Sequence, residues 1–182
     1  IGEGKVFAGL ADGMLYGLDQ LDGTVRWATE VTPWRTGGKT SSAPIYVNGM
    51  VLIGDSAGDN GGSSATMQAF TANNGKRIWS WGVIPTVGQP GYKTWSANSA
   101  GYTNNSTNGG GSMWESPIID PKLNLAIFGT GNPVPWNSRG PGMNLYTDSI
   151  VALNLYTGQL VWYCQTTHHD LWDADLPNNG VM

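Results

Sequence analysis

The chain has 182 residues, with 9 Lys+Arg against 13 Asp+Glu, a net charge of −4 and 40% hydrophobic residues. This length and composition suit one domain with a buried core, whereas the acidic balance and the lack of a basic cluster argue against a nucleic-acid partner. No apolar run in the sequence approaches the roughly 18–20 residues that a membrane-spanning helix needs.

Along the chain, β-prone runs alternate with glycine turns. The β-prone runs lie at 5–13, 41–56 and 116–131. Each run is followed by one of three similar segments, at 16–27, 68–79 and 151–162. Each segment has a small and an apolar residue, then a polar residue, then a glycine four positions before a tryptophan: Gly23 and Trp27, Gly75 and Trp79, Gly158 and Trp162. This pattern predicts a strand, a glycine turn and a second strand, hence an all-β chain of four-stranded meanders.

The spacing of the repeats predicts blades of a β-propeller, whose units have about 40–50 residues and four strands. The first two repeat tryptophans are 52 positions apart, and the wider second gap contains a polar Gly/Asn/Ser insertion at 87–112. The chain therefore holds three to four blades of a single propeller domain spanning residues 1–182. Because an open ring leaves strand edges unpaired, we expect this chain to be a stretch of a longer protein, lacking the true N-terminus and inactive alone.

Three further runs carry a resemblance to a known family: "GGGSMW" (109–114), "FGTGNPVPWN" (128–137) and "HHDLWDAD" (168–175). With the tryptophan repeats, they resemble the eight-bladed dehydrogenases that use pyrroloquinoline quinone (PQQ) to oxidise alcohols or sugars. The resemblance covers essentially the whole chain. It implies PQQ and a metal ion, Ca²⁺ or a lanthanide, as cofactors. It also implies a periplasmic location and a cytochrome c or ubiquinone as electron acceptor.

The resemblance assigns roles to residues of the first two runs. Trp114 would lie flat against the quinone, with Ser112 as a hydrogen-bonding neighbour, although a core or docking tryptophan is the alternative. Asn132 would offer its amide oxygen to the metal, although an asparagine before a proline is also a common turn signal.

A further segment, "SSAPIYVNGMVLIGDSAGD" (41–59), resembles one that ends in an acidic metal ligand. That ligand would be Asp59, with Ser41, Ser56, Ala57 and Gly58 against the cofactor. Many members have a glutamate here and an arginine soon after, whereas this chain has Asp59 followed by "NGGSSA". A surface-loop aspartate is the alternative.

The third run crowds charge into a chain in which only 12% of residues are charged. Asp173 matches the family's catalytic base and a metal ligand, and Asp175, two residues on, would share its face if the segment were a strand. Two carboxylates so close repel unless a cation lies between them, and Ca²⁺ prefers such oxygen ligands. His168 and His169 lack zinc-site spacing and are expected in the wall or entrance of the site.

Two other functions remain open. One is a non-catalytic propeller scaffold, similar to outer-membrane assembly lipoproteins, that retains only the repeats. The other is a degenerate quinoprotein that binds a metal without turnover, which the departures around Asp59 favour. The single cysteine, Cys164, cannot form an internal disulfide and is expected to be a small strand residue.

Overall fold

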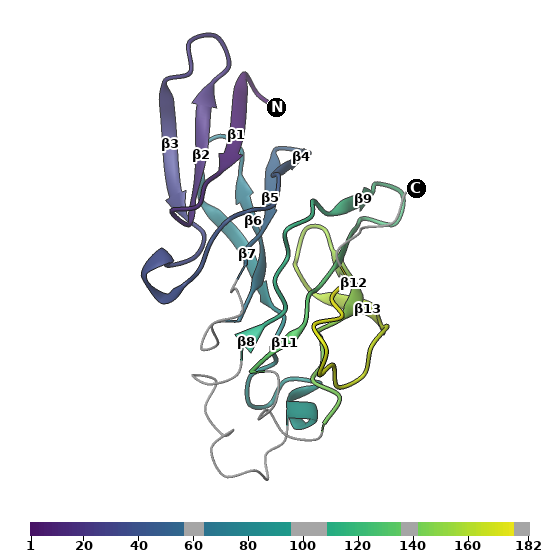
Figure 1. Ribbon diagram of the computed structural model, residues 1–182. Coiled ribbons are helices and arrows are strands. Elements are labelled where there is room, and N and C mark those ends of the chain that lie inside the picture. The colour runs from purple at the N-terminus through teal and green to yellow at the C-terminus, as the bar shows by residue number, and fades with distance from the viewer. Residues whose placement is uncertain (57–63, 96–108, 136–141, 177–182) are drawn as a thin grey trace.

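A computed structural model describes residues 1–56, 64–95, 109–135 and 142–176 and shows antiparallel sheets in chain order (Figure 1). The first sheet has three strands and the next two have four: β1 (Lys5–Gly9), β2 (Met14–Asp19) and β3 (Val25–Glu30); β4 (Ile45–Val47), β5 (Met50–Gly54), β6 (Thr66–Thr71) and β7 (Arg77–Gly82); β9 (Ile118–Asp120), β10 (Leu125–Gly129), β12 (Ser149–Asn154) and β13 (Leu160–Gln165). A small separate pair joins β8 (Gly109–Gly110) to β11 (Pro133–Val134).

These sheets confirm the all-β fold and the meander of four strands. The helices of the described ranges are two 3-10 turns, η1 (Trp34–Thr36) and η2 (Tyr92–Trp95). Neither these nor any other helix among the described residues has the length and apolar character to cross a membrane.

All three repeats build the same hairpin turn. In the first, the backbone N–H of Asp19 donates to the Thr24 carbonyl and the N–H of Gly23 donates to the Asp19 carbonyl, with Gly23 in the left-handed region at φ 74°. The other two repeats make the equivalent pairs, Thr71–Lys76 with Gly75–Thr71 and Asn154–Gln159 with Gly158–Asn154. Glycine recurs there because other residues strain at positive φ.

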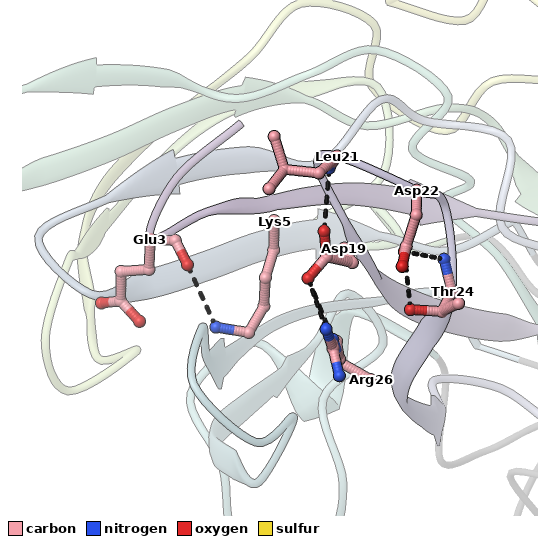
Figure 2. A network of polar contacts seen from close by, with 7 residues as sticks. All are labelled: Glu3, Lys5, Asp19, Leu21, Asp22, Thr24 and Arg26. Carbon is pink, nitrogen blue, oxygen red and sulfur yellow. Dashed lines mark hydrogen bonds and ion pairs between the residues drawn. The ribbon is translucent and has the colours of Figure 1, made fainter.

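The polar residue of the repeat closes each turn from its side chain. Figure 2 shows the first case, where Asp19 accepts from the Leu21 N–H at 2.8 Å and from Arg26 Nη2 at 2.7 Å, while Asp22 accepts from Thr24. The Leu21 N–H, and then Arg26, hold the pKa of Asp19 below its ordinary value. In the third repeat Asn154 does the same for the N–H groups of Tyr156 and Thr157.

Each repeat tryptophan that has a following sheet docks onto that sheet. The indole Nε1 of Trp27 donates to the Ala72 carbonyl at 3.1 Å, across a blade boundary. Its ring lies over Gly75, where a Cβ atom would meet Cε3 at 2.5 Å. A glycine at this turn is therefore needed both for its backbone conformation and for the neighbouring blade's tryptophan.

The second boundary repeats this contact, since Trp79 Nε1 donates to the Leu155 carbonyl at 3.0 Å and the ring covers Gly158. The third tryptophan, Trp162, is 41% exposed. Nothing lies within 4 Å of the position that a Cβ on Gly23 would take. Two of the three repeat tryptophans thus serve as inter-blade contacts within this chain.

The hydrophobic core lies between neighbouring sheets. Strand β5 buries both of its faces: Val51 and Ile53 join a cluster toward the first sheet, and Met50 and Leu52 join one toward the third. Alternate side chains of a strand point to opposite faces, which explains a continuous apolar run in an antiparallel strand. The first cluster also contains Phe7, Leu15, Val31, Phe70 and Ala72.

We expect Trp79→Ala to destabilise the 182-residue chain far more than Trp162→Ala. Losing a buried ring whose N–H satisfies the Leu155 carbonyl should lower the free energy of unfolding by about 3–5 kcal/mol. The half-exposed Trp162 should cost only about 1–2 kcal/mol. Urea unfolding followed by circular dichroism measures both, and equal losses would show that the inter-blade contact contributes little.

Candidate functional site

Two glycine-rich segments run side by side, one in the chain between the second and third sheets and the other directly after β10 of the third sheet. Beyond the β8–β11 pair, the N–H of Gly111 donates to the Asn132 carbonyl at 2.8 Å and the N–H of Gly131 donates to the Ser112 carbonyl at 3.0 Å (Figure 1). These bonds bring the runs "GGGSMW" and "GTGNP" together. Ser112 and Asn132 are both buried there, 8% and 4% exposed.

The end of β5 forms the next wall of this region. The N–H of Met113 donates to the Asp55 carbonyl at 2.9 Å, and the Ser56 hydroxyl donates to the Ser112 hydroxyl at 3.2 Å. Gly54 lies against Met113, whose Cβ is 2.7 Å from the position that a Cβ on Gly54 would take. Two predicted cofactor residues, Ser56 and Ser112, are therefore in direct contact.

The run "HHDLWDAD" is a tight turn and not a strand, so the shared strand face considered for Asp173 and Asp175 does not form. Asp173 and Asp175 both adopt left-handed conformations, at φ 63° and φ 50°. The turn is anchored by Asp170, 2% exposed, whose carboxylate accepts from the N–H groups of Trp172 at 2.8 Å and Ala174 at 2.6 Å. Aspartate tolerates left-handed conformations better than most residues, and a carboxylate stabilises such a turn through backbone N–H groups.

Gly131 is the point where the three segments meet. A Cβ there would lie 2.8 Å from Asp175 Oδ1 and 3.0 and 3.1 Å from Cζ3 and Cη2 of Trp114. Asp175 Oδ1 also accepts from the Asn132 N–H at 2.9 Å. The structure therefore brings together Trp114, Asn132 and Asp175. Ser112 lies beside them, because its carbonyl accepts from the Gly131 N–H.

Other predicted residues lie apart or outside the described ranges. Ser41 is exposed, whereas its neighbour Ser42 is buried and its hydroxyl donates to the Gly54 carbonyl. Ala57, Gly58 and Asp59 fall outside the described residues. Asp173 is exposed on the turn that also carries Asp175.

Both histidines belong to the run that carries Asp173 and Asp175, and the cysteine lies in a strand. His169 Nδ1 is 2.8 Å from the Gly142 carbonyl oxygen and 3.2 Å from Asn144 Oδ1, and His168 is exposed. Cys164 is a residue of β13, as expected, and is exposed.

The gathered side chains suit a flat anionic ring and a hard cation. Trp114 is only half-buried, so it retains aromatic surface, and its ring packs closely against Gly131 because that residue has no side chain. Asn132 Nδ2 donates to the Pro133 carbonyl at 3.3 Å, and the Asn132 backbone N–H donates to the Asp175 carboxylate at 2.9 Å. The amide oxygen is the atom of the Asn132 side chain that could bind a cation. Within the described ranges, no three His, Cys, Asp or Glu side chains form a metal cluster, so any cation there would draw on the asparagine.

Two buried carboxyl groups were missed by reasoning from the sequence. The sequence carried a signal for Asp170, because an aspartate at the start of a turn commonly accepts from the backbone N–H two residues on. Asp55 carried only a weak signal, as a polar residue directly after the apolar residues of β5. Asp55 is 3% exposed, and burial, partly offset by hydrogen bonds from Thr66 and Thr32, raises its pKa from 3.8 to about 7. The charged side chains on the surrounding segments are all exposed: Glu30, Arg35, Lys39, Arg77 and Glu115.

The sheets joined by tryptophan-on-glycine contacts define a β-propeller with docked blades. Residues 16–182 match the family described as "PQQ: Glucose/ethanol/alcohol dehydrogenase, beta-propeller domain", and the chain belongs to this family of quinoproteins. This confirms the resemblance read from the three runs and the repeats.

Similar proteins include the quinoprotein alcohol dehydrogenase PedH of Pseudomonas putida, 38% identical over 97% of this chain and 31% of that protein. The dehydrogenase subunit of an alcohol dehydrogenase (quinone) of Gluconobacter oxydans is 35% identical over 98% of this chain and 27% of its own length. Among solved structures, a europium-containing methanol dehydrogenase has a TM-score of 0.87 and 29% identity, over 98% of this chain and 33% of that one. The chain thus spans about a third or less of these proteins.

The raised pKa of Asp55 predicts a specific dependence of stability on pH. Between about pH 4 and pH 7 the folded chain keeps a proton that the unfolded chain has lost, so the free energy of unfolding falls as the pH rises through this window. Asp55→Asn removes this titration. Its stability relative to the unsubstituted chain should therefore increase from pH 4 to pH 8, by an amount on the order of 3–4 kcal/mol at most.

Urea unfolding at a series of pH values measures this difference. Asp120→Asn is the matched control, because Asp120 accepts from the N–H groups of Lys122 and Leu123 at the start of an exposed turn. This control makes the same chemical change away from the buried end of β5. A curve for Asp55→Asn that runs parallel to that of the unsubstituted chain would contradict the raised pKa of Asp55.

Proposed function

We propose that residues 1–182 are part of a single β-propeller domain of a PQQ- and metal-dependent dehydrogenase that oxidises an alcohol or a sugar. Membership of the quinoprotein family supports the reaction class. The observation that carries the proposal for this chain is the meeting of Trp114, Asn132 and Asp175 around Gly131. They come from three segments with no sequence contiguity, and each is of the type that the cofactor chemistry requires.

In this proposal Trp114 supplies the aromatic surface for the quinone. The hydroxyls of Ser112 and Ser56, in contact at 3.2 Å, supply hydrogen bonds at its polar edge. Ser41, Ala57 and Gly58 are assigned to the same cofactor by resemblance alone. Gly131 contributes by having no side chain, since any Cβ there would displace Trp114 or Asp175.

The proposed cation ligands are the Asp175 carboxylate, the Asn132 amide oxygen, Asp173 and Asp59. Such hard oxygen donors suit Ca²⁺, our first choice, and a bound cation would offset the repulsion between Asp173 and Asp175. A lanthanide is the alternative, because the structurally similar methanol dehydrogenase contains europium and Asp175 supplies additional negative charge. When bound, the quinone supplies the hydride acceptor that protein side chains lack.

Asp173 is the proposed general base, accepting the proton of the substrate hydroxyl. Its side chain is exposed, so an incoming substrate can reach it. Asp170 holds the turn on both sides of it, through the N–H groups of Trp172 and Ala174. A base on a turn fixed in this way is positioned before substrate arrives, which lowers the cost of proton transfer.

The electron acceptor and the cellular location are also proposals. Electrons would pass to a cytochrome c or to ubiquinone, in the periplasm, and the name of the Gluconobacter oxydans relative, alcohol dehydrogenase (quinone), supports a quinone acceptor for that protein. The remainder of the propeller would come from the longer protein to which this stretch belongs, and residues 1–182 alone would be inactive.

Binding of PQQ by the full-length protein that contains this chain should require a cation. Apo-protein reconstituted with PQQ and Ca²⁺ should show bound quinone by absorbance and dye-linked activity, and a chelator should abolish both. Gly131→Ala should weaken PQQ binding about 10- to 100-fold, because overpacking typically costs 1–3 kcal/mol. Gly82→Ala is the matched control, since its Cβ would meet only the Ile84 carbonyl oxygen at 3.8 Å.

Failure of the unsubstituted protein to bind PQQ with any cation would contradict the proposal and favour a non-catalytic scaffold. Full activity in a chelator, with no metal carried over, would contradict the role of the cation. PQQ and metal binding without turnover of any alcohol or sugar would identify a degenerate quinoprotein.

Asp173→Asn should separate cofactor binding from turnover. The amide keeps the shape and an oxygen for the metal but cannot accept a proton, so alcohol or sugar oxidation should fall about 10²- to 10⁴-fold while PQQ still binds. Asp22→Asn, in the exposed hairpin where Asp22 accepts from Thr24, makes the same chemical change far from the site and should leave turnover unaltered. Turnover of Asp173→Asn within a few-fold of the unsubstituted protein would show that another group takes the proton.

A further inference from the structure

Asp55 is a buried carboxyl group for which the proposed reaction has no use. It follows β5, at the boundary between the first and second sheets, and is 3% exposed. Its Oδ1 accepts from the Thr66 N–H at 2.6 Å and its Oδ2 from the Thr66 hydroxyl at 2.7 Å. The Thr32 side chain makes a further hydrogen bond to the same carboxyl group.

The backbone of Asp55 is held as firmly as its side chain. Its N–H donates to the Thr66 carbonyl at 3.0 Å, and its carbonyl accepts from the Met113 N–H at 2.9 Å. The next residue, Ser56, exchanges two backbone hydrogen bonds with Lys39, at 2.8 and 3.0 Å. Asp55 therefore links β6 on one side to the segment that carries Ser112 and Trp114 on the other.

The carboxyl group also belongs to a buried polar network that joins two blades. Gln68, 2% exposed, donates from Nε2 to the Thr66 hydroxyl at 2.7 Å and to the Val31 carbonyl at 2.7 Å. Arg77 Nη1 donates to Gln68 Oε1 at 3.4 Å, from the exposed side of β7. The carboxyl group is thus tied to the second blade through Thr66 and to the end of the first through Thr32.

We propose that Asp55 is a positioning residue of the candidate site: its carboxyl group fixes the backbone that supports Ser56 and, through Met113, Ser112 and Trp114. This inference rests on the proposed function for the identity of the cofactor, but not for the positioning itself. Without the carboxyl group, the buried Thr32 side chain and the hydroxyl and N–H of the half-buried Thr66 lose an acceptor, and a buried polar group without a partner is costly. The strand end would then depend on the bonds of the Ser42 hydroxyl to Gly54 and on the Ser56–Ser112 contact at the place where it meets the site.

The test compares Asp55→Ala, Asp55→Asn and the control Asp120→Asn in the full-length apo-protein. Hydrogen exchange followed by mass spectrometry reports on peptides covering 109–114 and on the blade segment 149–165. In Asp55→Ala we expect faster exchange in 109–114 but not in 149–165, and about tenfold or more weaker PQQ binding in the presence of Ca²⁺. Asp55→Asn retains the shape and one of the two acceptor oxygens, which can still accept from the Thr66 N–H, so both properties should return to within a few-fold of the unsubstituted protein.

Thr66→Val provides a second variant if Asp55→Ala does not fold, since it removes only the hydroxyl that donates to Asp55 Oδ2. It should change exchange in 109–114 in the same direction by a smaller factor. Unchanged exchange and affinity in Asp55→Ala would overturn the proposal, as would equal loss of protection in 149–165, which would indicate a general structural role. If the unsubstituted protein binds no PQQ, the proposed function is wrong but the positioning role is not decided by that result. The exchange rates of 109–114 would still show whether Asp55 positions this segment.

Discussion

The contact between a tryptophan of one blade and a glycine of the next is the constraint on which the rest of this structure depends. Trp27 on Gly75 and Trp79 on Gly158 each combine a buried or half-buried ring with an indole hydrogen bond across the boundary. The indole N–H finds a carbonyl acceptor 45 residues away in one case and 76 in the other. Because a four-stranded blade cannot bury its own faces, these contacts and the two core clusters fix how each blade lies on the next.

The site depends on those boundaries because its parts come from different blades. Ser56 follows a strand of the second sheet, Trp114 lies in the chain between the second and third, and Asp175 follows the third. A rotation at the Trp79 contact would therefore change the relation of Ser56 to Asp175 before any site residue was altered. Local carboxylates then set the finer geometry, with Asp55 bound to Thr66 and Asp170 bound to its own turn.

Much of the fold was predictable because its determinants are local in sequence. The glycine turn, the polar residue that closes it and the tryptophan four positions later all fall within one hairpin, so they can be read from a short segment. The partner of each tryptophan could not be read, since Gly75 receives Trp27 from the preceding repeat. The shared face considered for Asp173 and Asp175 required a strand, but their left-handed conformations belong to a turn held by the buried carboxylate of Asp170, whose burial is a tertiary property.

The same contact that joins the blades also offers a physical explanation of the site. Trp114 meets Gly131 with Cζ3 and Cη2 of its six-membered ring, whereas the docked tryptophans lie over their glycines with Cδ2 and Cε3, and both arrangements need a residue without a Cβ. Trp79 is 8% exposed, whereas Trp114, like the docked Trp27, is only half-buried, and Trp114 keeps accessible surface beside polar groups. A docked tryptophan with both sides covered can only hold structure together. Trp114 is supported along one edge, next to Asp175 and Asn132, and retains apolar surface that a flat ligand can cover. Covering this surface releases water, and because the side chain is already held in place, binding costs little further conformational entropy.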